Sequence, residues 1–90
     1  MQEVKSKWMV YKVNEMVSDE VSERWYADPE NEELERFADK AYEEMHRALD
    51  EFCAEVERFT GGQVDARTAK RMAVCPKYSG KLEALMARVA

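Results

Sequence analysis

The sequence is short of the residues that break helices, cross-link chains or fill a large aliphatic core. Its 90 residues include three Gly, two Pro and two Cys, with no Ile and only four Leu. So little Gly and Pro excludes a collagen-like or linker-like chain, and two Cys are too few for a disulfide framework. Because no run of 18 apolar residues occurs, we expect no membrane-spanning helix and no membrane partner.

The N-terminus has no apolar core followed by a cleavage-type site, so we expect a cytoplasmic protein rather than a secreted one. Its two thiols, Cys53 and Cys75, are then expected to be reduced. Ninety residues allow one domain, and a chain of this size buries only about 60% of its unfolded surface. We therefore expect stability to depend on self-association, a partner or a ligand.

The apolar residues that are present recur at helical spacing. A first helix is predicted over residues 1–27, because valines lie three and four residues apart along it. The valines are Val10, Val13, Val17 and Val21. An extended start before a helix from Asn14 is the alternative, since residues 8–11 are rich in strand-forming types.

A long helix is predicted over residues 28–60. Asp28-Pro29-Glu30 is typical of a helix start, because Asp caps free amide groups and Pro suits the first helical position. Gly61-Gly62 is typical of a helix end. Between them the apolar residues follow heptad spacing, which predicts a coiled-coil-like seam between two copies. The heptad residues are Ala38, Tyr42, Met45, Leu49, Phe52, Val56 and Phe59.

Two short helices are predicted after the glycines. The first, over 65–75, begins at the cap residue Asp65 and ends before Pro76. The second, over 79–90, has one apolar face, formed by Leu82, Leu85, Met86 and Val89. The predicted fold is all-α: a helical hairpin with one long central helix plus two short C-terminal helices, completed as a bundle by dimerisation or by a partner.

This order of helices, with the Gly61–Asp65 link before a short helix, resembles a histone fold. The resemblance implies that two chains clasp through their long helices and that the dimer binds nucleic acid. The Arg and Asp pair that typically braces this loop in that family is absent, because no acidic residue lies within Ala66 to Val74.

Charge is distributed unevenly along the chain. Residues 1–65 hold eight basic and eighteen acidic residues, a net of -10, whereas residues 66–90 hold six basic residues and one acidic residue, a net of +5. A cationic end can neutralise phosphates, so nucleic-acid binding is one alternative. Its residues would be Arg67, Lys70, Arg71, Lys77 and Lys81. The favoured interpretation packs this basic end against the acidic long helix, in the same or a second chain.

A second alternative is a metal site on the long helix. Glu43 and His46 have the spacing with which carboxylate-bridged metal bundles supply two ligands from one helix, and Asp50 lies one turn further along. Carboxylates and imidazole suit iron, manganese or zinc. The favoured interpretation is a solvated flank with no cofactor, in which Glu43 and Arg47 form an ordinary ion pair.

The sequence contains no phosphate-binding Gly-rich loop and no Ser-His or Cys-His signature. We therefore expect a non-catalytic interaction protein, an accessory, adaptor or inhibitor-like subunit, that pairs with itself or with another protein. The expected partner-binding residues are Trp8, Trp25, Tyr42, Met45, Leu49, Phe52 and Phe59. The Met and aromatic residues, Met9 and Met16 included, are compatible with an adaptable binding surface, but core filling is the favoured interpretation.

Overall fold

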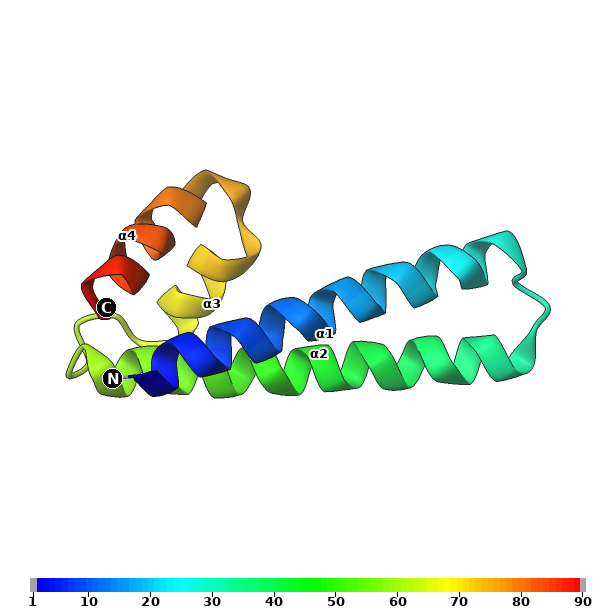
Figure 1. Cartoon of the computed structure of the whole chain (residues 1–90), viewed down its shortest axis with the longest axis horizontal. Helices are drawn as coiled ribbons and strands as arrows, with labels where there is room; N and C mark the ends of the chain where they lie inside the picture. The colour runs from blue at the N-terminus through cyan, green and yellow to red at the C-terminus, as the bar shows by residue number, and fades with distance from the viewer. Residues whose placement is uncertain (1, 90) are drawn as a thin grey trace.

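Two long antiparallel helices form a hairpin, and two short helices pack against one end of it (Figure 1). This computed structural model describes residues 2–89, apart from the side chains of residues 2, 76, 79, 83, 86, 88 and 89. The elements are α1 (Gln2–Ala27), α2 (Glu32–Phe59), α3 (Ala66–Val74), the 3-10 helix η1 (Pro76–Tyr78) and α4 (Ser79–Val89). The predicted all-α fold is confirmed. No helix within the described residues is long and apolar enough to cross a membrane.

The turn between α1 and α2 differs from the sequence prediction. Asp28 precedes Pro29 and so is disfavoured in a helix, which ends α1. The Asp28 carbonyl accepts the Asn31 N–H at 3.1 Å, which closes a tight turn with Pro29 in its second position. Asn31 then caps α2, since its Oδ1 accepts the Leu34 N–H at 3.0 Å. The prediction that α2 starts at Asp28 is therefore wrong.

Other helix ends follow the sequence. Gly61 and Gly62 have φ values of 63° and 89°, the left-handed conformation that glycine adopts at little cost. Their N–H groups donate to the carbonyls of Arg58 at 3.2 Å and Glu57 at 2.9 Å, which satisfies the end of α2. The Asp65 carboxylate accepts the Thr68 N–H at 2.7 Å and caps α3. α1 is helical from residue 2, so the extended start is wrong.

The core lies at the end of the hairpin that α3 and α4 cover. Leu49, Phe52 and Val56 of α2 are at most 1% exposed there. They belong to one buried cluster, formed by Val4, Tyr11, Ala48, Leu49, Phe52, Cys53, Val56, Ala69 and Leu82. Leu85 packs against this cluster, as predicted for α4, while the side chains of Met86 and Val89 lie outside the described residues. All four α-helices therefore contribute to a single core.

The rest of the hairpin forms an arm, residues 13–44, that projects beyond this core (Figure 1). Its buried side chains are all small: Ser18, Ala38 and Ala41. The molecule measures 46 × 22 × 21 Å and has a radius of gyration of 14.8 Å, whereas a globular chain of this length has about 12 Å. The arm thus has two helices in contact but little apolar area between them.

We predict that Phe52→Ala destabilises the protein by about 3–5 kcal/mol, because it leaves a cavity at the centre of the core. Phe37→Ala is the matched control, since Phe37 is 62% exposed and its loss should cost less than about 0.5 kcal/mol. Urea titrations followed by circular dichroism measure both changes. Equal destabilisation by the two substitutions would contradict this placement of the core.

We also predict an acid-dependent contribution from the α3 cap. The hydrogen bonds from the Thr68 backbone and hydroxyl hold the pKa of Asp65 below its usual value of 3.8. A lowered carboxyl pKa stabilises the fold at neutral pH, and this stabilisation disappears as the pH falls through that range. Asp65→Asn keeps the accepting oxygen but cannot titrate, so it should lose less stability than the unmodified chain between pH 7 and pH 3. Identical losses in parallel urea titrations would refute the cap's contribution.

Candidate functional site

Polar side chains occupy part of the contact between α1 and α2. The Tyr11 hydroxyl donates to Glu15 Oε2 at 2.8 Å, and Lys12 Nζ donates to Glu15 Oε1 at 2.9 Å. Burial raises the pKa of Tyr11, and the bond to Glu15 adds to this effect. Burial also opposes ionisation of Glu15, but the bonds from Lys12 and Tyr11 outweigh it and hold the pKa of Glu15 low. The pKa shift of Tyr11 therefore comes mainly from burial, and that of Glu15 from its hydrogen bonds within α1.

The inward residues of α1 repeat every seven positions: Val4, Tyr11 and Ser18 are all buried. This repeat places Val10, Val13 and Val17 of the predicted valine stripe on the opposite side of the helix, whereas Val21 is half-buried. The resulting surface, called here the outer face, consists of Met9, Val10, Val13, Met16 and Val17, which are 62%, 49%, 56%, 69% and 44% exposed. α1 thus has apolar residues on two sides, and its partner α2 covers only one of them.

Core filling is correct for some methionines and wrong for others. Met45 and Met72 are partly buried against the core cluster, as expected. Met9 and Met16 are the most exposed residues of the outer face, so core filling is wrong for them. Their positions could not be assigned from spacing, because the inward repeat of α1 contains Glu15, Ser18 and Ser22 and is no more apolar than the outer face.

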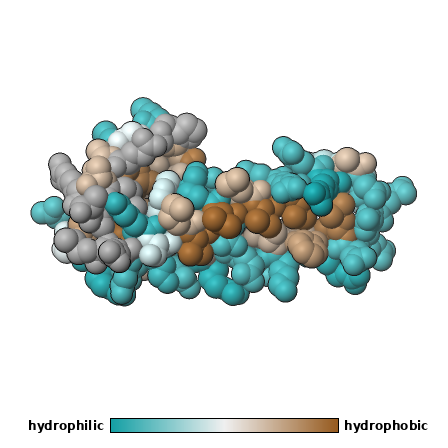
Figure 2. All heavy atoms as spheres, viewed as in Figure 1, coloured by the Kyte–Doolittle hydropathy of each residue, from teal (hydrophilic) through white to brown (hydrophobic). Residues whose placement is uncertain are grey.

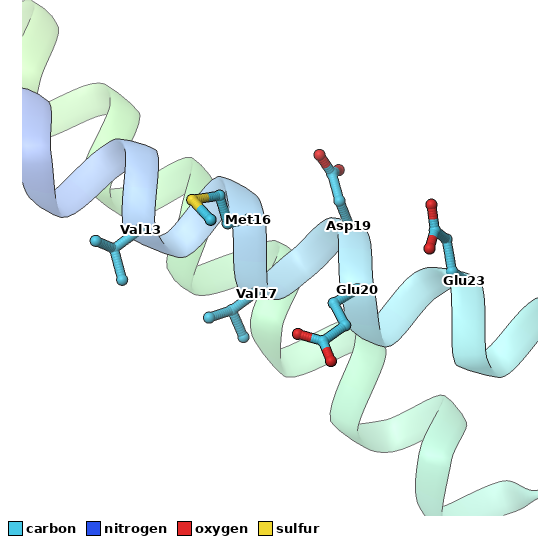
Figure 3. A pocket seen from close by; sticks show the side chains of 6 residues that line it. All are labelled: Val13, Met16, Val17, Asp19, Glu20 and Glu23. Atoms are coloured by element: carbon cyan, nitrogen blue, oxygen red, sulfur yellow. The ribbon is translucent and has the colours of Figure 1, made fainter.

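Apolar side chains form a band along the molecule, bordered by hydrophilic ones (Figure 2). On α1 a shallow groove is lined by Val13, Met16, Val17, Asp19, Glu20 and Glu23. Figure 3 shows Val13, Val17 and Glu20 along one edge of the helix and Asp19 and Glu23 along the opposite edge. The outer face therefore becomes acidic toward the tip of the arm.

The arm carries further exposed apolar side chains near its tip. Tyr26, Phe37 and Tyr42 are 72%, 62% and 55% exposed. Trp25 is only half-buried, yet its indole Nε1 is buried and has no hydrogen-bond partner among the described residues. Most of the large apolar side chains that are exposed therefore lie on the outer face of α1 or on the arm.

The predicted partner-binding residues divide into two groups. Leu49 and Phe52 are core residues, which the chain's own helices cover. Trp8, Met45 and Phe59 pack partly buried against that core, and the Trp8 ring lies 4.9 Å from the Phe52 ring. Only Tyr42 is well exposed, and Trp25 is intermediate. The heptad stripe of α2 is thus largely used within the chain, and the outer face of α1 is the surface that sequence reasoning missed.

The predicted metal-ligating residues lie on the solvent side of α2. Glu43 and Asp50 are exposed, and half-buried His46 contacts the Tyr42 ring with 4.4 Å between ring centroids. Among the residues that the structure describes, no three His, Cys, Asp or Glu side chains come together as a metal site would require. α1 therefore adds no third ligand to Glu43 and His46.

The predicted nucleic-acid residues are all exposed. Arg67 and the other four occupy α3, η1 and α4, and Lys77 and Lys81 lie over the Tyr78 ring at 5.8 Å and 5.6 Å. The salt bridges found among the described side chains are Lys7–Glu51, Lys12–Glu15, Arg24–Glu20 and Arg58–Glu55. None of them joins this basic end to α2.

Comparison with known proteins adds no family to these observations. No family model, no curated protein and no solved structure matches the chain.

We predict that the two thiols differ strongly in reactivity. Cys53 is 2% exposed, and burial raises its pKa to about 11, whereas Cys75 is half-buried. Because the thiolate is the reactive form, Ellman's reagent at pH 8 should modify one thiol quickly and the second only as the protein unfolds. Cys75→Ser should remove the fast phase. Two thiols that react at one rate would contradict the burial of Cys53.

Proposed function

We propose that this chain is a non-catalytic interaction protein, and that the outer face of α1 binds an amphipathic helix of another polypeptide chain. The observation that carries the proposal is the exposure of five large apolar side chains on one side of one helix. Single exposed apolar residues are ordinary on protein surfaces, but a continuous apolar strip bordered by charges is typical of a binding surface.

The construction of the arm supports this proposal. Its two helices meet through Ser18, Ala38 and Ala41, whose small side chains bury little apolar area and so contribute little stability. Two helices alone rarely form a stable unit, since most helical stability comes from packing an apolar face. A helix laid on the outer face would supply the missing contact and turn the arm into a bundle.

The titrating groups are consistent with a non-catalytic role. Groups with shifted pKa values often mark active sites when they line a cleft. Here Tyr11 and Glu15 bond to each other between two packed helices, and the Cys53 thiol lies in the core. Burial explains the pKa shifts of Tyr11 and Cys53, and hydrogen bonds within α1 explain that of Glu15, so none of them requires a catalytic role.

We predict that replacing both Val13 and Met16 with Glu abolishes association while the helical content stays unchanged, because neither side chain is in the core. Each buried apolar side chain of this size contributes about 2 kcal/mol, so the double variant should bind at least about 100-fold more weakly. Native mass spectrometry of the tagged chain, expressed in its own cells, measures complexes heavier than the 10.5 kDa monomer.

Phe37→Glu is the control for that experiment, since it adds one negative charge, half the change of the double variant, to an exposed apolar position of α2. It should leave the complexes intact. A chain that remains at 10.5 kDa at every concentration, or a double variant that associates as well as the unmodified chain, would refute the proposed function.

A further inference from the structure

We infer that the helix that binds the outer face is α1 of a second copy, antiparallel and related by a twofold axis. This inference rests on the proposed function and names its partner. The charges that border the outer face favour this partner, because the antiparallel arrangement brings more opposite charges together than the parallel one.

Both edges of the outer face change sign along α1. A first edge follows steps of seven residues and carries positive charge before negative charge: Lys5, Lys12, Asp19 and Tyr26. The second edge carries the opposite order: Glu3, Val10, Val17 and Arg24. Steps of seven return to the same side of a helix that packs in a coiled coil, so each set stays on its own edge.

In the proposed dimer the twofold axis passes between Asn14 and Glu15. Each edge of one copy then faces the same edge of the second copy. On the first edge, Lys12 then faces Asp19 of the second copy, and Lys5 faces the Tyr26 ring. On the second edge, Val10 faces Val17, and Glu3 faces Arg24. Every pair occurs twice, because a twofold contact uses the same patch on both chains.

The middle of the face fits the same register. Val13 lies opposite Met16 of the second copy, so the most exposed methionine of each chain contacts a valine of the other. Met9 lies opposite Glu20, which Arg24 already holds at 2.8 Å along the helix, so the methionine packs on the aliphatic part of that ion pair. The apolar residues thus meet at the centre, and the charged ones lie at the rim.

A parallel pairing would match fewer charges. It would place the first edge of one helix against the second edge of the other, so that Lys5 and Lys12 face valines and only Asp19 and Arg24 bring opposite charges together. α2 offers no equivalent surface, because the central row on its solvent side is charged: Arg36, Glu43, Asp50 and Glu57. The antiparallel pairing of two α1 helices is therefore the one that charge favours.

The available area suits a small dimer. The outer face is open along its whole length, since Glu3, Lys5 and Ser6 are exposed as well as the five apolar residues. Over two copies these side chains bury on the order of 1,000 Å², which is near the lower limit for a specific interface. A reversible dimer follows, in which the two arms form a four-helix unit and the two core ends lie at its opposite extremes.

Disulfide trapping in the full chain tests the register. Cys75→Ser provides the background, and Cys53 is retained because it is 2% exposed. Chains carrying Val10→Cys and chains carrying Val17→Cys are mixed under mild oxidation. The mixture should cross-link rapidly, whereas either variant alone should not. By helical rise the two copies of position 10 lie about 13 Å apart along the dimer and the two copies of position 17 about 8 Å apart, and a disulfide needs Cα atoms within about 7 Å. Glu43→Cys is the control on the solvent side of α2.

Charge reversal provides a second readout. Lys12→Glu and Asp19→Lys should each weaken dimerisation roughly fivefold, and the double variant should recover it, because the pair is restored with its signs exchanged. Analytical ultracentrifugation measures the dimerisation constant, and circular dichroism monitors the fold of each monomer. Weakening without recovery would overturn the proposed pairing.

The remaining outcomes separate the two proposals. Rapid cross-linking of Val10→Cys with itself would overturn the antiparallel register. A purified chain that stays monomeric, but joins a different protein in its own cells through the outer face, would overturn the second copy and leave the proposed function standing. A chain that is monomeric both when purified and in cells would overturn both.

Discussion

The fold depends on the packing of Leu49, Phe52 and Val56. These apolar residues lie three and four positions apart, on one face in the second half of α2. They lie in one cluster with side chains from α1, α3 and α4, so this part of α2 is covered from more than one direction. Because four helices share one core, a chain with no Ile and four Leu still buries a continuous apolar centre. Trp8 closes this centre by placing its ring on Phe52.

The position of that core at one end of the hairpin leaves the other end uncovered. α3 and α4 are too short to cover the full hairpin, so residues 13–44 extend as an arm with only small residues between its helices. The apolar side chains of the arm that do not fit between α1 and α2 point outward, and Met16 and Val13 are the clearest examples. An arm with so little buried apolar area contributes little to the stability of the single chain.

Local sequence signals predicted the helices well, and the exceptions have a physical cause. Gly61-Gly62 and Asp65 act as predicted because a helix end needs only its own neighbours to satisfy it. Asp28 does not cap α2, because Asp28 and Pro29 form a tight turn. Asn31, three residues later, is the cap that accepts a free amide of α2. The predicted site residues fared differently: Leu49 and Phe52 are indeed the strongest apolar positions of α2, but that same property made them core rather than surface.

The sequence by itself determined which segments are helical, where α2 ends and α3 begins, and that opposite charges gather at opposite ends of the chain. Only the tertiary structure decided which side of α1 is inside. Both sides of that helix have a regular repeat, and the inward one contains Tyr11, Glu15 and Ser18, which spacing alone would not select. The choice is made by contacts distant in sequence: Tyr11 is buried against the core with its hydroxyl satisfied by Glu15, and Ser18 is small enough for close helix packing. The valines and methionines opposite are left exposed.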